Sequence, residues 1–286
     1  MSLSETSARD LLIPNKDGHR LHARLWSVEK PRGVVVIAHG FGEHGGWYDH
    51  VARAIGPACD LDFLAPDLRG HGRSPGKRGV VARFEELTGD LIAAFDWAGH
   101  EYQGLPRWVL GHSNGGQVAL RAALDAKAGP QIAGLILSNP SIKVAVHVPE
   151  YKLRLAKFLL RFAPGVTLKA PLDVAKLTRD PAMQQRRRDD PLGHSRISAP
   201  LFFGMMEGGL MIARRAGEIR VPLLLILGGA DPIIDPLSTR EVFDRFGSED
   251  KTLLLYPNML HEPFNEVGRE KVLTDVAAWI NVHIKL

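Results

Sequence analysis

Short apolar runs alternate with amphipathic stretches along most of the chain. The strand-like runs occur at residues 33–42, 62–67, 108–113, 133–140, 221–231 and 252–257. Helix-like patterns occur at residues 47–56, 84–102, 117–126, 238–246 and 269–284. Continuous apolar runs are typical of strands that are buried on both faces. Their alternation with helices predicts an α/β protein whose mostly parallel, doubly wound sheet carries helices on both sides.

Two segments depart from this alternation. Residues 11–28 contain two extended stretches around the turn Asn15-Lys16-Asp17-Gly18, which predicts a hairpin at a sheet edge. Residues 141–217 contain several prolines, with helical pieces such as residues 151–162 between them. The alternation then resumes. We therefore predict a core of residues 1–140 and 218–286, interrupted by a helical cap at residues 141–217.

The composition fits a single large globular unit. The chain has 286 residues, of which 45% are hydrophobic and 24% charged, as in ordinary soluble domains. Cys59 is the only cysteine, which excludes an internal disulfide and a cysteine-rich metal site. The first ten residues resemble no export signal, and no apolar run approaches the roughly 18 residues of a spanning helix. We expect a cytoplasmic protein.

Positive charge is concentrated in the predicted cap. The net charge of the chain is +4, but residues 141–217 hold 14 Lys and Arg against 6 Asp and Glu. This local surplus does not indicate nucleic-acid binding by the whole chain, and no nucleic-acid partner is expected. Within the cap, Arg186, Arg187 and Arg188 adjoin Asp189 and Asp190. We interpret this run as solvated and self-neutralising, with a phosphate-binding patch as the alternative.

One serine lies between glycines where a strand pattern passes into a helix pattern. Residues 111–115 read GHSNG, which fits the G-x-S-x-G nucleophile elbow. The small neighbours suit the strained backbone of a turn that exposes a single hydroxyl. Ser113 is therefore the predicted nucleophile, and a purely structural serine in a glycine-rich turn is the alternative.

Two later residues stand where partners of this serine are expected. Asp231 follows the run VPLLLILGGA, and His261 lies in the loop before the final helix. Since doubly wound sheets place their chemistry at the carboxyl ends of strands, Asp231 and His261 complete a predicted Ser-Asp-His triad. Asp235 is a rival acid, and His261 could instead be a surface or capping residue. The sequence HEPFN breaks the HExxH zinc motif at Asn265, so no metal site is predicted.

The oxyanion formed during acyl transfer needs backbone donors. We predict the N–H of Asn114, which follows the nucleophile, and the N–H of Phe41 in the loop HGFGEHGGWY. A loop that merely turns is the alternative. His39, His44 and His50 are interpreted as loop-ordering residues, because their spacing is irregular and no carboxylate-rich shell joins them. Asp67, in DLRGHGRS, is interpreted as a structural residue that caps or packs a loop.

The blocks HGFGEH, DLRGHGRS, GHSNGG, GGADPIIDP and MLHEPFNE, in this order, resemble the monoacylglycerol lipase and lysophospholipase group of α/β-hydrolases. The resemblance extends from about Leu21 to the C-terminus and is weakest in the insertion. It implies an α/β-hydrolase fold with a mobile cap, a serine carboxylester hydrolase and no cofactor. It assigns the same triad and the same two oxyanion donors. At Asn114 the family usually has methionine, so we expect the polar side chain to alter chain selectivity.

The helix predicted at residues 151–162 is amphipathic. Its apolar stripe, which we expect to cover an acyl-binding tunnel, comprises Tyr151, Leu155, Phe158, Leu159 and Phe162. Basic side chains elsewhere on the helix could meet anionic headgroups at a membrane surface. Ordinary packing of an amphipathic helix onto the domain is the alternative.

The leading functional hypothesis is hydrolysis of a single-chain lipid ester, a monoacylglycerol or a lysophospholipid, through an acyl-enzyme on Ser113. A general short-chain esterase fits the same triad. A proline-specific peptidase is less favoured, because the cap is basic and such enzymes need acidic residues to bind a free amino terminus. A non-hydrolytic receptor with the same fold remains the alternative from another functional class. Acyl length, headgroup and oligomeric state stay open at this stage.

Overall fold

The computed structural model describes residues 7–146, 148–170 and 172–284. Its centre is an eight-stranded sheet in the order β1-β2-β4-β3-β5-β6-β9-β10, in which β2 runs antiparallel to both of its neighbours, β1 and β4, and the pairs from β4 to β10 are parallel. The strands are β1 (Ser7–Pro14), β2 (Arg20–Ser27), β3 (Val34–Ala38), β4 (Asp62–Pro66), β5 (Arg107–His112), β6 (Ile132–Ser138), β9 (Leu223–Gly228) and β10 (Lys251–Tyr256). The predicted hairpin at the sheet edge is confirmed.

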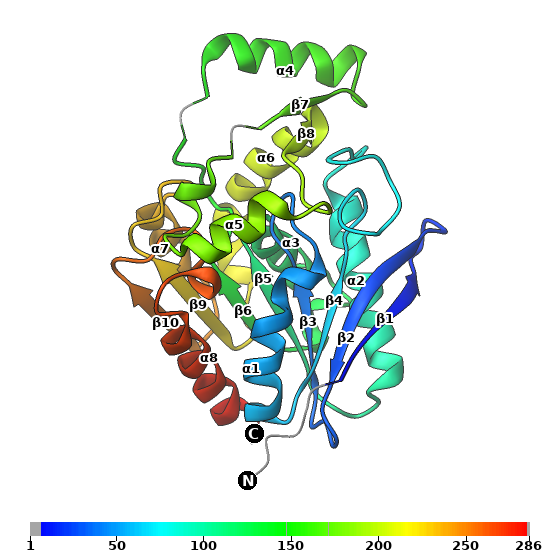
Figure 1. Ribbon diagram of the computed structural model, residues 1–286, viewed down its shortest axis with the longest axis vertical. Helices are drawn as coiled ribbons and strands as arrows, with labels where there is room; N and C mark the ends of the chain where they lie inside the picture. Colours follow the sequence, from blue (N-terminus) through cyan, green and yellow to red (C-terminus); the bar gives the residue numbers. More distant parts are fainter. Residues whose placement is uncertain (1–6, 147, 171, 285–286) are drawn as a thin grey trace.

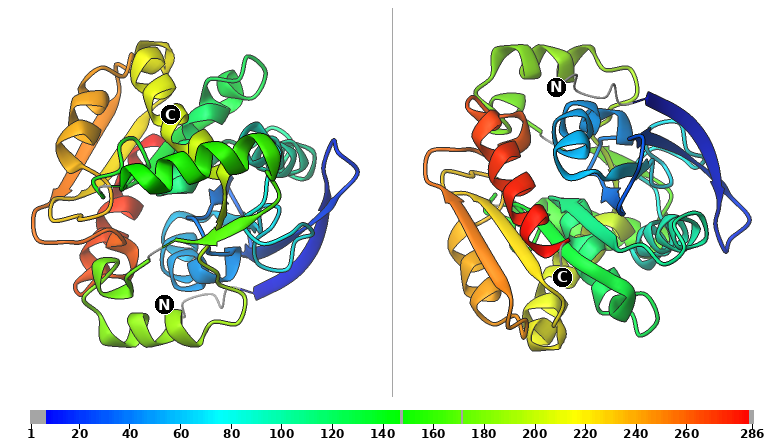
Figure 2. Two further views of the ribbon diagram at one scale, coloured as in Figure 1. Left: turned by 90° about the horizontal axis from the view of Figure 1, so that it is seen from above. Right: turned by 90° about the horizontal axis from the view of Figure 1, so that it is seen from below.

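Helices cover both faces of this sheet (Figures 1 and 2). One buried cluster includes Val51 of α1 and Val272 of α8; the other includes Leu91 of α2 and Val118 of α3. The bounds are α1 (Asp49–Cys59), α2 (Glu85–Glu101), α3 (Asn114–Ala123), α7 (Pro236–Asp244) and α8 (Arg269–His283). Strands β3, β4 and β9 are buried along their whole length, as expected for strands between two helical layers. The predicted α/β-hydrolase architecture is confirmed.

Residues between β6 and β9 rise above the carboxyl ends of the strands (Figure 1). They form α4 (Glu150–Phe162), β7 (Thr167–Lys169), α5 (Pro181–Asp189), β8 (Arg196–Ser198) and α6 (Ala199–Arg215), with β7 and β8 paired as a small antiparallel sheet. Helix α4 has no buried residue. Helix α6, by contrast, contributes Leu201 and Ile212 to the core. The cap bounds of 141–217 stay a prediction, because the end of this segment packs as part of the core.

Short 3-10 helices complete the fold: η1 (Gly45–Tyr48), η2 (Gly129–Gln131), η3 (Val174–Lys176), η4 (Ala216–Glu218) and η5 (Pro263–Asn265). Side-chain caps explain where several helices begin. Asp180 accepts from the N–H groups of Ala182 and Met183 at the start of α5, and Pro181 follows it. Such caps satisfy donors that have no partner within the helix. None of the described helices has the length and hydropathy needed to cross a bilayer.

Candidate active site

Ser113 occupies a sharp turn between β5 and α3. Its φ of 52° and ψ of −119° lie in a region that costs an L-residue energy. The turn is possible because its neighbours lack side chains: a Cβ on Gly111 would lie 2.7 Å from the Cα of Gly116, and a Cβ on Gly115 would overlap the carbonyl oxygen of Ala38. The glycines therefore let α3 pack against the ends of the strands while the serine protrudes.

The three predicted triad side chains form one hydrogen-bonded chain. His261 Nε2 lies 2.8 Å from Ser113 Oγ, and His261 Nδ1 lies 2.7 Å from Asp231 Oδ2. Asp231 follows β9, and His261 follows β10. All three residues are buried. A proton on Nδ1 that is donated to Asp231 leaves Nε2 free to accept the serine proton, which is the arrangement general-base catalysis requires.

Burial and charge oppose each other at this triad. Burial alone would raise the pKa of Asp231, but the nearby His261 and the N–H groups of Ile233 and Ile234 lower it overall. For His261, burial lowers the pKa, but the hydrogen bond and charge of Asp231, together with the charges of Glu262 and Glu43, more than offset this, so the net pKa is raised above 6.5. The carboxylate therefore stays charged and stabilises the imidazolium that forms during proton transfer.

Asp235 does not belong to this chain of hydrogen bonds. Its side chain accepts from the N–H of Leu237 and from Ser238 Oγ, and it caps α7. An aspartate just before a proline at the first helical position is a usual helix start. The structure thus favours Asp231 over Asp235 as the partner of His261.

Asn139 supports Asp231 and was missed by the sequence analysis. Its Nδ2 donates to Asp231 Oδ2 at 2.6 Å, and its Oδ1 accepts from the N–H of Gly228 at 2.8 Å. It is fully buried, and its φ is 39°, a conformation that asparagine tolerates better than most residues. Its position directly after β6, at the carboxyl edge of the sheet, was the available signal.

The predicted oxyanion donors belong to the residue after Ser113 and to the loop after β3. Asn114 is the first residue of α3, where a backbone N–H has no partner within the helix. Phe41 lies in the loop after β3, and it lines the same cavity as Ser113. The side chain of Asn114 is buried, and its Oδ1 has no hydrogen-bond partner. It does not belong to the cavity wall, so the structure gives no support to a direct effect on chain selectivity.

Arg187 corrects the interpretation of the arginine run as solvated. Its side chain is only 8% exposed, and its Nη1 lies 2.9 Å from Glu43 Oε1 and 3.3 Å from Glu262 Oε1. The neighbouring aspartates do not neutralise it: Asp190 instead accepts from Trp47 Nε1 at 2.7 Å. The side chain at position 187 points toward Glu43 and Glu262 at the cavity, so sequence adjacency to acidic residues was a misleading guide.

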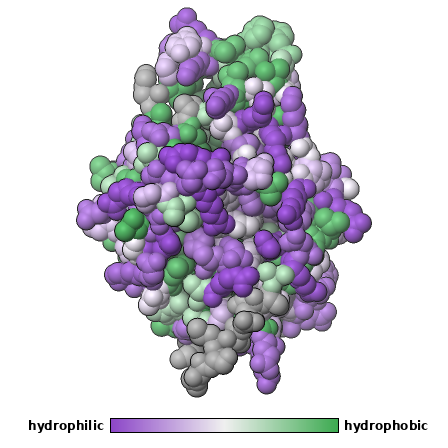
Figure 3. Space-filling model, viewed as in Figure 1, coloured by the Kyte–Doolittle hydropathy of each residue, from purple (hydrophilic) through white to green (hydrophobic). Residues whose placement is uncertain are grey.

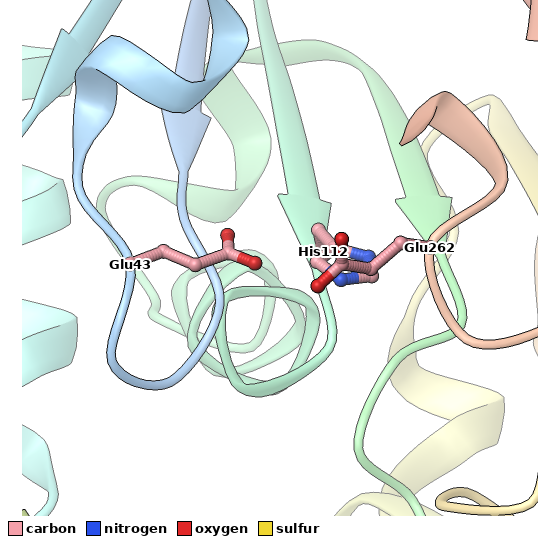
Figure 4. Close-up of side chains that lie close together, drawn as sticks. All are labelled: Glu43, His112 and Glu262. Carbon is pink, nitrogen blue, oxygen red and sulfur yellow. The ribbon is translucent and has the colours of Figure 1, made fainter. Parts of the chain in front are cut away.

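Glu43, His112 and Glu262 converge on the same point (Figure 4). One potential metal-ligand atom from each lies within 4.8 Å of the others. Both carboxylates already bind the guanidinium of Arg187, however, so their charge is matched by a cation from the protein itself. Burial raises the pKa of Glu262, whereas Arg187 brings the pKa of Glu43 well below its usual range despite burial. Burial lowers the pKa of His112 to about 4.

The other predicted loop residues order the backbone. His39 Nε2 accepts from a backbone N–H at 3.0 Å, His44 Nε2 lies 3.1 Å from Asp190, and His50 Nε2 lies 2.8 Å from a backbone carbonyl. Asp67 accepts from two backbone N–H groups in the loops that follow β3 and β4. These contacts agree with the structural roles predicted for all four residues.

A cavity of about 540 Å³ opens beside Ser113 and His261, and its wall is mainly apolar. Of the five predicted cap residues, Tyr151, Leu155 and Leu159 line it. Phe158 and Phe162 do not: they are 57% and 66% exposed, and their ring centroids lie 5.0 Å apart with the ring planes tilted by 43°. The cavity-facing side of α4 also includes Lys152 and Ala156. At about 100° per residue, this side is rotated from the predicted stripe, which leaves Phe158 outside it. Phe162 falls within its angular range but is the last residue of α4, beyond the part of the helix that lines the cavity.

A sequence profile of the serine aminopeptidase S33 family matches residues 29–268. The monoacylglycerol lipase of Mycolicibacterium smegmatis is 36% identical over 93% of this chain and 95% of its own length. The human monoglyceride lipase is 31% identical over 94% of this chain and 89% of its own. The crystal structure of Paleococcus ferrophilus monoacylglycerol lipase superimposes with a TM-score of 0.82, at 32% identity, and covers 92% of this chain and 99% of that one. The chain belongs to the serine aminopeptidase S33 family of α/β-hydrolases, in the group that contains the monoacylglycerol lipases.

Proposed function

We propose that this protein cleaves the carboxylic ester of a single-chain lipid through an acyl-enzyme on Ser113, with monoacylglycerols preferred to lysophospholipids. It is a serine hydrolase of lipid esters, in keeping with its family. The observation that carries the proposal is the chain of hydrogen bonds from Asp231 through His261 to Ser113, which opens directly on a large apolar cavity.

The geometry supports a two-step reaction. Ser113 Oγ attacks the ester carbonyl while its proton passes to His261 Nε2, and the N–H groups of Phe41 and Asn114 bind the oxyanion. Collapse of this intermediate expels the alcohol, which takes the proton from His261 and leaves the acyl group on Ser113. Water then attacks the acyl-enzyme with the same base, and the fatty acid is released. No further reactant is needed.

The cavity supports a long acyl chain. Its volume of about 540 Å³ lies in the range of roughly 300–1,000 Å³ that is usual for sites that enclose small molecules. Each buried methylene contributes about 0.8 kcal/mol. Because RT is about 0.6 kcal/mol, kcat/KM should rise by up to about fourfold per methylene until the cavity is filled.

The charged side chains near Ser113 favour an ester substrate whose alcohol part is uncharged. The polar wall there includes Glu43, Glu262 and Arg187, which together place two carboxyl groups against one guanidinium. Because Arg187 is already bound by both carboxyl groups, it is poorly placed to accept a phosphate as well. A glycerol moiety carries no charge and meets no such conflict. This contrast favours monoacylglycerols over lysophospholipids.

The cap supports peripheral contact with an anionic membrane. Apolar side chains gather over part of α4 at the top of the molecule (Figure 3). Tyr151, Phe158 and Phe162 of this helix are all more than half exposed. Lys157 and Arg161 lie on the same helix. Co-sedimentation with vesicles should be stronger for anionic than for neutral lipid and should weaken in the double variant Phe158→Ser/Phe162→Ser. Equal, negligible sedimentation with both lipids would refute this part of the proposal.

The test of the activity is fatty-acid release from monoacylglycerols, lysophospholipids and short-chain p-nitrophenyl esters. Ser113→Ala should abolish turnover of every ester, while Ser141→Ala, in the same cavity wall, serves as a matched control. Turnover of short-chain esters alone would make the protein a general esterase. Aminoacyl amides are included because the matching family is described as serine aminopeptidase S33, and a preference for them over lipid esters would overturn the proposal.

A further inference from the structure

The two cap helices beside the site are attached differently. Helix α4 has no buried residue, whereas α5 contacts the loop after β3 through several groups. Arg186 lies over the ring of Trp47 at 4.5 Å and donates to the carbonyl oxygen of Gly46 at 3.0 Å. Asp190 accepts from Trp47 Nε1. The predicted oxyanion loop is thus held by a helix of the cap.

The contacts of this loop fix the peptide unit that carries the Phe41 N–H. This unit consists of the Gly40 carbonyl and the Phe41 N–H, and its Gly40 oxygen lies 2.8 Å from His39 Nδ1. In the preceding peptide unit, the Gly40 N–H donates to Glu43 Oε2 at 2.9 Å. The peptide after it offers the Phe41 carbonyl to Arg187 Nη2 at 3.5 Å. Since each peptide is planar, these three bonds set the direction of the Phe41 N–H.

Arg187 is the group that joins this arrangement to the catalytic base. Its Nη1 lies between Glu43 of the oxyanion loop and Glu262, the residue that follows His261. Glu43 is also held by the hydroxyl of Tyr48 at 3.0 Å. A rigid, planar guanidinium can bind several acceptors at fixed angles, which a lysine ammonium does not reproduce.

We infer that Arg187 is a positioning residue, which orients the Phe41 N–H through its bonds to Glu43 and to the Phe41 carbonyl. Stabilisation of the oxyanion therefore requires that α5 be docked on the core in its observed position. This inference rests on the proposed function, because it assigns Arg187 to the same reaction. Arg187 acts on the transition state through the loop, and its loss should therefore lower kcat more than it changes KM.

The experiment compares Arg187→Gln, Arg187→Lys and the control Arg188→Gln. Arg188 is exposed on the same helix, and its Nη2 donates to Gln184 Oε1 of that helix at 3.2 Å. Turnover of p-nitrophenyl butyrate is measured per active site titrated with a fluorophosphonate, so that unfolded protein does not enter kcat. Loss of a whole oxyanion donor costs roughly 10²–10³ in kcat. A donor that is displaced but still present should lower kcat less than this. For Arg187→Gln we expect kcat to fall by about 10- to 100-fold, with KM within about threefold of the wild type.

Arg187→Lys should fall between the wild type and Arg187→Gln, and Arg188→Gln should stay within twofold of the wild type. If Arg187→Gln does not accumulate as folded protein, Arg187→Lys decides the matter, with an expected fall of at least threefold. A kcat per titrated site within twofold of the wild type in the folded Arg187 variants would overturn the inference and leave Arg187 a purely structural residue. Absence of turnover in the wild type would overturn the proposed function instead.

Discussion

Replacing Asn139 by aspartate tests the role of its amide with almost no change in shape. The amide nitrogen that now donates to Asp231 at 2.6 Å becomes a carboxyl oxygen, while the Oδ1 that accepts from the Gly228 N–H can remain in place. Aspartate also tolerates the positive φ of this position. The substitution therefore removes only the bonds that the amide nitrogen donates, to Asp231 and at 3.3 Å to the Leu260 carbonyl oxygen, and leaves the backbone conformation unchanged.

The magnitude follows from the distance. A hydrogen bond to a charged group contributes about 1.5–3 kcal/mol. Two carboxylates whose charges lie about 4 Å apart would repel by about 4 kcal/mol at an effective dielectric constant near 20. The buried pair should avoid this repulsion by retaining one proton, which raises the pKa of the pair in the folded state. A pKa raised by folding contributes stability at low pH, and this stability is lost as the pH rises through it.

The assay is urea unfolding of the wild type, Asn139→Asp and Asn139→Ala at pH 5 and pH 8.5. Relative to the wild type, the free energy of unfolding of Asn139→Asp should be lowered by several kcal/mol more at pH 8.5 than at pH 5. Asn139→Ala loses the bond to Asp231 and also the bond from the Gly228 N–H, but it adds no charge, so its destabilisation should be nearly equal at both pH values. If the two variants show the same pH dependence, the amide of Asn139 does not act on the Asp231 carboxylate.

Three further predictions concern the site and its surroundings. Because His261 must be unprotonated to act as a base and its pKa is raised, kcat/KM should fall as the pH drops through this pKa. Asp231→Asn should move the fall to lower pH and, as in serine protease triads, lower kcat by about 10⁴. An acidic limb of the pH profile that does not move in this variant would argue against the pairing of Asp231 with His261. Gly42→Ala should cost more stability in thermal unfolding than Gly18→Ala, because both have positive φ but only a Cβ at Gly42 overlaps a cap carbonyl; equal losses would contradict this. Burial raises the pKa of the Cys59 thiol to about 12, so iodoacetamide should not label the native protein at pH 8 but should label it in urea.

Local patterns were sufficient to predict the fold and to place three side chains at one sheet edge. The prediction used continuous apolar strands, the glycines of the nucleophile elbow and the tendency of catalytic residues to follow the carboxyl ends of strands. Each of these signals depends on a few neighbouring residues, and together they led to Ser113, Asp231 and His261. Their role in catalysis stays a prediction until turnover is measured. Asp231 was preferred to the rival Asp235 because it lies closer to the strand end, and the bond of Asp231 to His261 and the cap that Asp235 forms on α7 agree with this preference.

Partners that are distant in sequence could not be predicted in the same way. Arg187 bonds to Glu43, 144 residues away, and to Glu262, 75 residues away, and no local pattern specifies such pairs. The periodicity of α4 gave an apolar stripe, but the stripe does not show which part of it faces a cavity when the helix buries nothing. Phe158 and Phe162 were therefore placed on the wrong surface.

The loose attachment of α4 and the firm attachment of α5 divide the cap into a part open to redesign and a part that is not. Exchange of α4 for a helix of other size or polarity would alter the walls at Tyr151, Leu155 and Leu159 with little cost to the core. Exchange of α5 would remove the only guanidinium that bonds to both Glu43 and Glu262 in the described chain. Engineering of chain-length preference should therefore begin in α4 and leave α5 intact.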